Sequence, residues 1–370
     1  MSTPGRSPDG ALIDAIGSRD VLVCCGSGGV GKTTTAATLG LELAHRGRRV
    51  VVVTIDPAKR LADALGLDEG LDNEPTRLHR AVAPGGAGEL WAMMLDTAAT
   101  FDGLVRANAP TPERAERILA NPFYRNIAGA LSGTQEYMAA ERLHALHADE
   151  RFDVVIVDTP PTRNALDFLD APGTLARFLD HPLFKMMMLP ARRGLAVLNL
   201  AAQPALRTIG KVVGGDVLAD AIAFFQAFEG METGFRERAD EVMELLRAPS
   251  TCYVLVASPK ADTIDEAIYF AERLAESSLD VGALIVNRCT PVFEPGRPDT
   301  PRRPSDDALW ANLDELAATG NAERSQLRPL VDRIGGAPVA WVPLLAGDVH
   351  DLASLHQIRA LLFDPTRHSG

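Results

Sequence analysis

The segment Gly26–Thr34, which reads Gly-Ser-Gly-Gly-Val-Gly-Lys-Thr-Thr, limits the possible folds of this chain more than any other segment. It satisfies the pattern Gly-x-x-x-x-Gly-Lys-[Ser/Thr] of a phosphate-binding loop. A short apolar run, Val21–Cys25, precedes it, and apolar residues at helical spacing follow over Thr33–Arg46. Because the motif needs a strand before it and a helix after it, this context predicts a nucleoside triphosphate site in an α/β fold.

The residue types of the loop predict how it binds phosphate. Glycines let successive backbone N–H groups point at the anion without Cβ clashes. We expect Lys32 to reach the β- and γ-phosphates and to act in catalysis, and Thr33 to offer its hydroxyl to Mg²⁺. The predicted nucleotide-binding residues here are Gly28, Gly29, Val30, Gly31, Lys32, Thr33 and Thr34.

Strand-like and helical patterns alternate along the chain, which predicts a doubly wound, mostly parallel sheet. Further strand-like runs are Val50–Ile55, Leu90–Leu95, Val154–Val157, Thr251–Ala257, Ala283–Val286 and Val339–Val342. Further helical patterns are Thr263–Ser277, Asp306–Thr319 and Leu352–Leu362. The fold class is therefore α/β, a P-loop NTPase.

Two long stretches, 97–151 and 171–249, have helical periodicity without convincing strands. We interpret them as a discontinuous helical subdomain inserted into an ATPase domain made of residues 21–96, 152–170 and 250–364. Residues 1–20 are expected to form a flexible leader, since Met1–Gly10 is polar and rich in Pro, Gly and Ser.

Two strand-like runs end in an aspartate. Asp56 follows Val50–Ile55, and Asp158 follows Val154–Val157. Ligands bind at the carboxyl ends of strands in such sheets, so Asp56 is expected to orient the attacking water or take its proton. Asp158, after four apolar residues, has the form of a Walker B carboxylate that holds Mg²⁺, partly through water. The alternatives are a helix cap for Asp56 and a strand-end turn for Asp158.

These motifs resemble those of the arsenical-pump and tail-anchored-protein-targeting ATPase family, a branch of the deviant P-loop ATPases. The resemblance runs from Val21 to about Leu362. It implies a dimeric, Mg²⁺-dependent ATPase with two switch segments. The first switch matches at Asp56, Pro57 and Ala58, and the second at Asp158, Thr159, Pro161 and Thr162.

The chain departs from this family at three places. Members usually carry a lysine after the first glycine, which reaches the partner's nucleotide across a dimer, but this chain has Ser27. Lys59 and Arg60 replace His-Ser or His-Asn of the first switch, and Arg163 and Asn164 replace Gly-His of the second. The missing positive charge would come from Lys59 or Arg60, or from a homologous partner chain that keeps the lysine; the sequence favours the partner.

The C-terminal part contains two further resemblances. Asn287 and Arg288 end a strand-like run. This run resembles the family's strand whose terminal Asn recognises adenine. Pro343 and Leu344 begin a segment similar to the loop that packs on adenine. These four residues complete the predicted nucleotide site, although an Asn that ends a strand is also an ordinary turn signal.

The helical stretches suggest a client surface. Met186, Met187 and Met188 lie among apolar neighbours, and methionine adapts to varied apolar partners. The resemblance implies a hydrophobic client or a membrane protein as partner. The alternative, which the sequence favours slightly, is that these methionines and the apolar stripe from Phe224 to Leu246 are subdomain core.

Composition narrows the choice of function. A net charge of −12 argues against a broad nucleic-acid surface, so no nucleic acid partner is expected. Four cysteines without a Cys-x-x-Cys pair suggest buried thiols, with neither zinc nor an iron–sulfur cluster, in a cytoplasmic protein that is at most peripheral to a membrane. We expect a dimeric ATPase switch with ATP and Mg²⁺. A poorly hydrolysing scaffold and a partition or positioning ATPase are the alternatives.

Overall fold

A computed structural model describes residues 8–56, 60–82, 87–122, 124–125, 134–160, 169, 171, 220, 223–224, 227, 230–291 and 307–364. The chain divides into two compact units. The first comprises Met1–Met94, Leu146–Leu166 and Pro249–Gly370, and the second comprises Leu95–Ala145 and Asp167–Ala248. We propose that the first is the predicted ATPase domain and the second the inserted helical subdomain; they are called the sheet unit and the helical unit below.

The sheet unit contains an eight-stranded sheet in the order β3-β4-β2-β5-β1-β6-β7-β8. All neighbouring strands are parallel except β3 and β4. The strands are β1 (Val21–Cys25), β2 (Arg49–Thr54), β3 (Thr76–Arg77), β4 (Glu89–Met94), β5 (Val154–Asp158), β6 (Thr251–Ala257), β7 (Val281–Cys289) and β8 (Val339–Pro343). Every predicted strand is present, and the predicted α/β class is confirmed. The short β3 was not predicted.

One face of the sheet is covered by α1 (Pro8–Ile16), α2 (Lys32–His45), α3 (Arg60–Leu65) and α15 (Leu352–Phe363), whose apolar residues share one core with alternate residues of the strands. The helix α2 lies close to the strands at Gly40, where a Cβ would come within 2.8 Å of the Val52 side chain. In α1, Leu12 and Ile16 are fully buried. The second part of the expected leader is therefore a packed helix, because its few apolar residues share one helical face.

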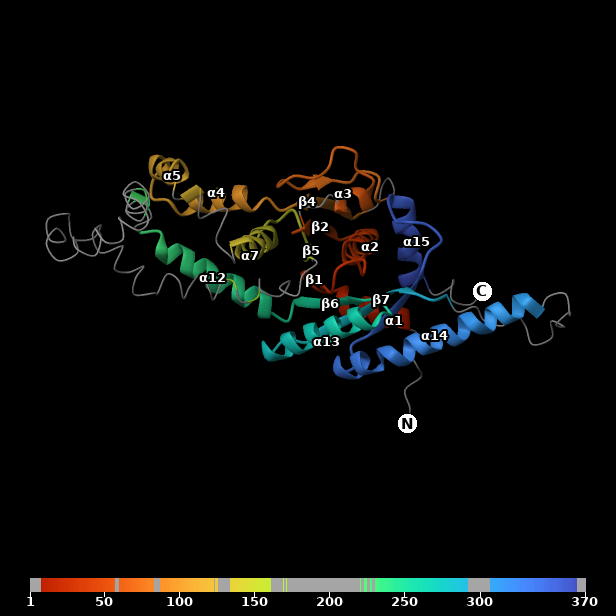
Figure 1. The fold of residues 1–370 in the computed structure, drawn as a ribbon. Coiled ribbons are helices and arrows are strands. Elements are labelled where there is room, and N and C mark those ends of the chain that lie inside the picture. The colour runs from red at the N-terminus through yellow and green to blue at the C-terminus, as the bar shows by residue number, and fades with distance from the viewer. Residues whose placement is uncertain are drawn as a thin grey trace. The chain divides into compact units, whose positions relative to one another are not determined.

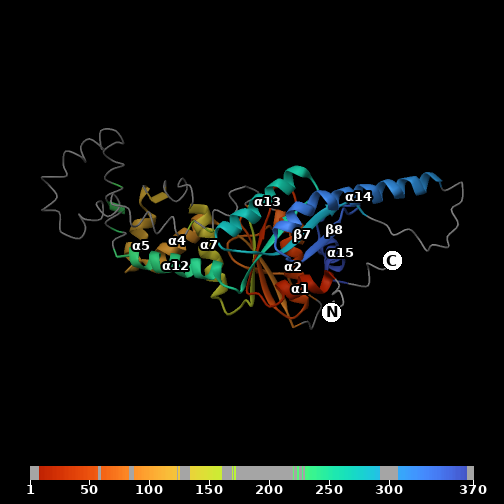
Figure 2. The same cartoon turned by 90° about the horizontal axis from the view of Figure 1, so that it is seen from below.

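The helices α13 (Ala261–Glu276) and α14 (Asp307–Arg333) lie on the other side of the sheet from α2 and α15 (Figure 2). The helix α14 was expected to end at Thr319, before Gly320 and Asn321, but it continues to Arg333. Leu327 and Leu330 in its second half are fully buried. Their burial outweighs the weak helix propensity of the glycine.

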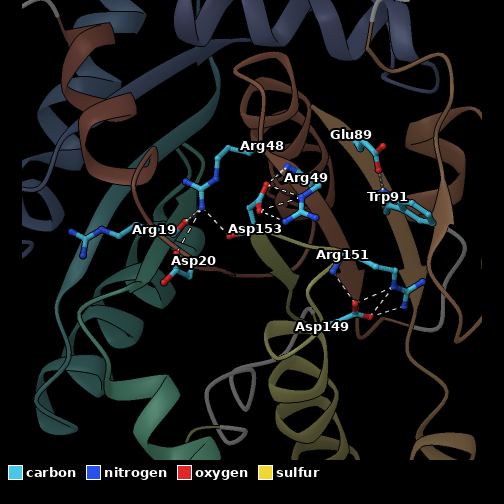
Figure 3. A network of polar contacts seen from close by, with 9 residues as sticks. All are labelled: Arg19, Asp20, Arg48, Arg49, Glu89, Trp91, Asp149, Arg151 and Asp153. Atoms are coloured by element: carbon cyan, nitrogen blue, oxygen red, sulfur yellow. Dashed lines mark hydrogen bonds and ion pairs between the residues drawn. The ribbon is translucent and has the colours of Figure 1, made fainter. Parts of the chain in front are cut away.

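Two arginines connect the amino ends of the strands (Figure 3). The guanidinium of Arg48 donates to the carbonyl oxygens of Gly17, Arg19 and Asp153 at 2.9, 3.3 and 2.8 Å. Arg49 pairs with the Asp153 carboxylate at 2.6 Å, and its hydrogen bonds hold the pKa of Asp153 below the usual value. These contacts connect the start of β2 to the start of β5. They lie at the amino ends of the strands, whereas the phosphate-binding loop lies at the carboxyl ends.

The helical unit contains α4 (Thr97–Asn108), α5 (Pro112–Leu119), α12 (Glu232–Arg247) and most of α7 (Thr134–His147) (Figure 1). Its core includes Leu104, Ile118, Tyr124, Tyr137, Met138, Phe224, Met231, Phe235 and Ala239. The described part of the stripe that begins at Phe224 therefore contributes core residues. Met186, Met187 and Met188 lie outside the described residues.

A polar cluster joins α7 to α12 within this unit. Arg238 lies 3.3 Å from Glu141 Oε1, 2.9 Å from Glu241 Oε2 and 2.8 Å from His144 Nδ1. Glu141 is 6% exposed, and burial raises its pKa to about 7, although Arg238 opposes the shift. Tyr137, one turn earlier on α7, faces the same carboxylate, and its pKa is also raised by burial.

This cluster predicts a pH-dependent stability. The pKa of Glu141 is higher in the folded chain, so the free energy of unfolding falls as pH rises from about 4.5 to about 7. We expect Glu141→Gln to be more stable than the wild type by about 2 kcal/mol at pH 8 and nearly equal to it at pH 5. Denaturant unfolding at the two pH values measures the difference. Glu237→Gln, at an exposed site on α12, is the control and should show no such pH dependence. An equal effect of Glu141→Gln at both pH values would contradict the prediction.

Candidate functional site

The loop between β1 and α2 has a backbone that requires glycine. Gly26, Gly29 and Gly31 have φ values of +150°, +76° and +95°. A Cβ on Gly26 would lie 2.1 Å from the carbonyl oxygen of Val256, and one on Gly31 would lie 2.3 Å from Nδ2 of Asn287. The loop therefore packs against the ends of β6 and β7 at positions where no side chain fits. Gly28 and Gly29 are exposed, so this part of the loop is open to a ligand.

Lys32 begins α2 and folds back over the loop. Its Nζ donates to the carbonyl oxygen of Ser27 at 2.8 Å, and the residue is only 6% exposed. Burial lowers the pKa of Lys32, whereas the carboxylates of Asp158 and Asp56 favour its charged form. The ammonium group is thus held at the loop and interacts with both Asp56, the predicted catalytic carboxylate, and Asp158, the predicted Mg²⁺ ligand. Thr34, the last predicted residue of the loop, accepts at its carbonyl oxygen from Thr38.

Asp158 ends β5 and is almost fully buried, at 1% exposure. Its Oδ2 accepts from the hydroxyls of Thr33 at 2.7 Å and Thr54 at 2.9 Å, but its Oδ1 has no hydrogen-bond partner. Burial raises its pKa to about 6, and the two hydroxyls oppose that shift. A buried carboxylate oxygen without a partner, next to a threonine hydroxyl at a phosphate-binding loop, fits Mg²⁺.

Among the described residues, no group of three acidic, histidine or cysteine side chains is arranged to hold a metal. Mg²⁺ in nucleotide sites keeps several waters and takes further oxygens from the phosphates. The Thr33 and Asp158 pair therefore fits the protein's share of such a site.

Asp56 lies two residues after the end of β2 and is 8% exposed. Its Oδ2 is 3.4 Å from Nη1 of Arg60, and its backbone N–H donates to the Thr54 hydroxyl at 3.3 Å. The carboxylate also acts electrostatically on Lys32 and Asp158, so the three ionisable groups share one site. Pro57, Ala58 and Lys59 lie outside the described residues.

Thr54 is a site residue that the sequence analysis missed. It is the last residue of β2, and its hydroxyl links Asp158 to the backbone of Asp56. Its signal in the sequence is a single polar residue at the end of an otherwise apolar strand. That signal becomes meaningful only when β2 and β5 are known to be neighbours.

Thr159 is buried at 1% exposure, and its hydroxyl donates to the carbonyl oxygen of Cys24 at 2.8 Å. The start of the predicted second switch is thus tied to β1, directly before the phosphate-binding loop. Pro161 and Thr162 lie outside the described residues, as do Arg163 and Asn164.

Asn287 contacts the loop itself. Its Nδ2 donates to the carbonyl oxygen of Val30 at 2.9 Å, and its Oδ1 accepts from the N–H of Arg288, which has a φ of +62°. Leu344 donates its N–H to the carbonyl oxygen of Cys289 at 2.8 Å and is 58% exposed, while Pro343 is half-buried. Asn287 therefore supports the loop, and Leu344 offers an apolar surface at the same edge of the sheet.

The four cysteines are all buried and free, as predicted. Within the described ranges, no helix combines the length and the apolar character needed to cross a bilayer. The sheet, the phosphate-binding loop and the carboxylates at the ends of β2 and β5 define a P-loop nucleoside triphosphatase.

Comparison with known proteins gives the family. A model of the anion-transporting ATPases matches residues 19–364, so the chain belongs to that family, and it is an ATPase. The ATPase GET3 of Malassezia globosa is 26% identical over 267 residues, which are 72% of each chain. That of Rhodotorula glutinis is 28% identical over 264 residues, 71% of this chain and 68% of the relative. That of Kluyveromyces lactis is 25% identical over 366 residues, 93% of this chain and 90% of the relative.

Proposed function

We propose that this ATPase is a Mg²⁺-dependent switch that dimerises with ATP and uses its helical unit to bind a hydrophobic client in the cytoplasm or at a membrane surface. The observation that carries the proposal is the contact of Thr33 and Thr54 with one oxygen of Asp158, whose other oxygen has no partner. A hydroxyl and a carboxylate so arranged beside a phosphate-binding loop suit a Mg²⁺-bound triphosphate. The homology to GET3 ATPases supports the client-binding part.

The chemistry of hydrolysis follows from these residues. Loop N–H groups and Lys32 would hold the β- and γ-phosphates, and the bound ion would neutralise their developing charge. Asp56 would orient a water and accept its proton as the water oxygen attacks the γ-phosphorus and the bond to ADP breaks. The contact of Thr159 with the carbonyl oxygen of Cys24 would relay the state of this site to the second switch.

Asn287, Arg288, Pro343 and Leu344 are proposed to receive the adenine base. The exposed side chain of Leu344 supports packing against a flat ring. Asn287 uses one N–H of its Nδ2 on Val30, so the second N–H of this amide is the donor that would recognise the base.

The alternatives have less support. A positioning ATPase would need a free amphipathic helix or a basic surface, but Leu355, Ile358 and Leu362 of α15 are buried in the core of the sheet unit. A poorly hydrolysing scaffold is favoured by Ser27, which supplies no positive charge and is 4% exposed. In that case, a homologous partner carrying the lysine would complete the site.

The purified chain tests this proposal through its hydrolysis rate and its mass in solution. We expect phosphate release only with both ATP and Mg²⁺, and a dimer by light scattering with a non-hydrolysable ATP analogue but not with ADP. ATP binding without hydrolysis would support the scaffold. A monomer in every nucleotide state would contradict the dimeric switch, and a mixture with a homologous chain would then show whether the partner is a different protein.

A further inference from the structure

The site has an acidic excess around one buried ammonium group. The carboxylates of Asp56 and Asp158 both interact electrostatically with the ammonium group of Lys32. One hydrogen bond of that ammonium group is donated to the carbonyl oxygen of Ser27. In the transition state of hydrolysis, negative charge is spread over the three equatorial oxygens of the transferred phosphoryl group and develops on the leaving oxygen. Ser27 brings no positive charge to this group, because its hydroxyl is neutral and buried.

Arg60 is the described cation best placed to supply that charge from the same chain. Its Nη1 lies 3.4 Å from Oδ2 of Asp56, the carboxylate proposed to orient the water. Its charge also reaches Lys32, since the pKa of Lys32 is lowered by burial first and by Arg60 as well. The guanidinium therefore pairs with Asp56 and acts electrostatically on Lys32, the two groups that would flank the γ-phosphate.

The side chain of Arg60 is also able to move. It is 56% exposed, whereas that of Asp56 is 12% exposed. The closest approach of the two groups is 3.4 Å, between Nη1 of Arg60 and Oδ2 of Asp56, and ion pairs of exposed arginines contribute little stability. Moving the guanidinium from Asp56 to a phosphate oxygen would exchange one anion for another of higher charge.

We propose that Arg60 is a catalytic residue that stabilises the transition state of ATP hydrolysis from within the same chain, in place of the lysine that Ser27 replaces. Without nucleotide, it is paired with Asp56. With ATP, it turns toward the γ-phosphate, which frees Asp56 to bind the attacking water, and its contact with the phosphoryl oxygens is strongest in the transition state. The proton of that water goes to Asp56 and the bridging electrons go to ADP, so Arg60 transfers nothing and acts only by charge and hydrogen bonding.

This inference rests on the proposed ATPase site and is tested by comparing two analogues of bound nucleotide. ADP with beryllium fluoride resembles the ground state, and ADP with aluminium fluoride resembles the transition state. We expect Arg60→Ala to bind the first within about threefold of the wild type, to bind the second at least about tenfold more weakly, and to have a kcat about 10- to 100-fold lower. Arg60→Lys should recover part of the loss.

Arg46→Ala is a matched control, because Arg46 also forms an i,i+4 ion pair, with Glu42, at the far end of α2. It should leave the affinity for both analogues unchanged. Ser27→Lys tests the competing source of charge. We expect it to raise the kcat of Arg60→Ala more than that of the wild type, because Arg60 already supplies the cation in the wild type.

The proposal is overturned if Arg60→Ala binds both analogues as the wild type does, or if its kcat rises because Arg60 merely restrains Asp56. Strong activation by Ser27→Lys together with a neutral Arg60→Ala would assign the charge to a partner instead. The analogue titration needs no turnover, so it tests the role of Arg60 in binding the transition state even if the wild type hydrolyses ATP slowly. A wild type that binds neither analogue would contradict the proposed function itself.

Discussion

Replacing Asp56 with Asn is expected to lower kcat for ATP hydrolysis by about 1,000-fold while ATP affinity stays nearly unchanged. The amide is isosteric with the carboxylate and keeps its place after β2, but it cannot accept the proton of the attacking water. The 8% exposure of Asp56 and its electrostatic effect on Lys32 and Asp158 put the carboxylate within the phosphate site rather than on the surface. The proton-acceptor role therefore predicts a loss of kcat rather than of binding.

The measurement is steady-state phosphate release at saturating Mg²⁺-ATP, combined with equilibrium titration of a non-hydrolysable analogue. Asp63→Asn is the control, because Asp63 is an exposed aspartate on the neighbouring helix α3 and should keep the wild-type rate. A kcat for Asp56→Asn comparable to that of the wild type would reject the role of Asp56. A large loss of analogue affinity would instead indicate that Asp56 contributes to binding.

Replacing Asp158 with Asn is expected to have two opposite effects. The apparent affinity for Mg²⁺ in the presence of ATP should fall about 10- to 100-fold, because the unpartnered carboxylate oxygen that suits a hydrated cation becomes an amide. The nucleotide-free chain should become more stable at pH 8 by about 1–2 kcal/mol, because burial raises the pKa of Asp158 to about 6 and its ionised form is costly.

The sign of the stability effect follows from that pKa. A group whose pKa is raised in the folded state stabilises it less as pH rises, here from about 4 to about 6, and the cost is complete above that range. The variant should therefore gain stability at pH 8 and show little gain at pH 4. Thermal unfolding at both pH values, with and without Mg²⁺-ATP, measures the stability difference, and hydrolysis against Mg²⁺ concentration measures the affinity.

Asp153→Asn provides a contrast of opposite sign. Its carboxylate, just before the same strand, is paired with Arg49, and its pKa is lowered mainly by that hydrogen bond. Removing this charge should lower the stability at pH 8 and leave the Mg²⁺ requirement unchanged. An unchanged Mg²⁺ requirement in Asp158→Asn would remove Asp158 from the proposed metal site.

Much of the site could be predicted because its parts are local. The glycine pattern of the phosphate-binding loop specifies a backbone with positive φ at Gly26, Gly29 and Gly31, and the apolar runs around it specify a buried strand and a helix. The carboxylates Asp56 and Asp158 were found because an aspartate that ends a buried strand lies at the ligand-binding edge of a parallel sheet. Each of these inferences needs only a few consecutive residues.

Other features depended on contacts between distant segments. The order β2-β5-β1 brings Thr54 beside Asp158, although 104 positions separate them in the chain. The contact of Asn287 with the carbonyl oxygen of Val30 required β7 to end beside the loop. The sequence favoured a partner chain as the source of the missing charge, whereas the contact of Arg60 with Asp56 supports a source within the same chain.

The sequence by itself determined the strands, the loop and the carboxylates, since backbone conformation and burial periodicity are encoded locally. Only the tertiary structure decided that part of the expected leader is the packed helix α1, that α14 continues to Arg333, and that Thr54 contacts Asp158 and Arg60 contacts Asp56. The physical reason is that burial and hydrogen bonding between segments far apart in the chain outweigh the weak local preferences of single residues such as Gly320.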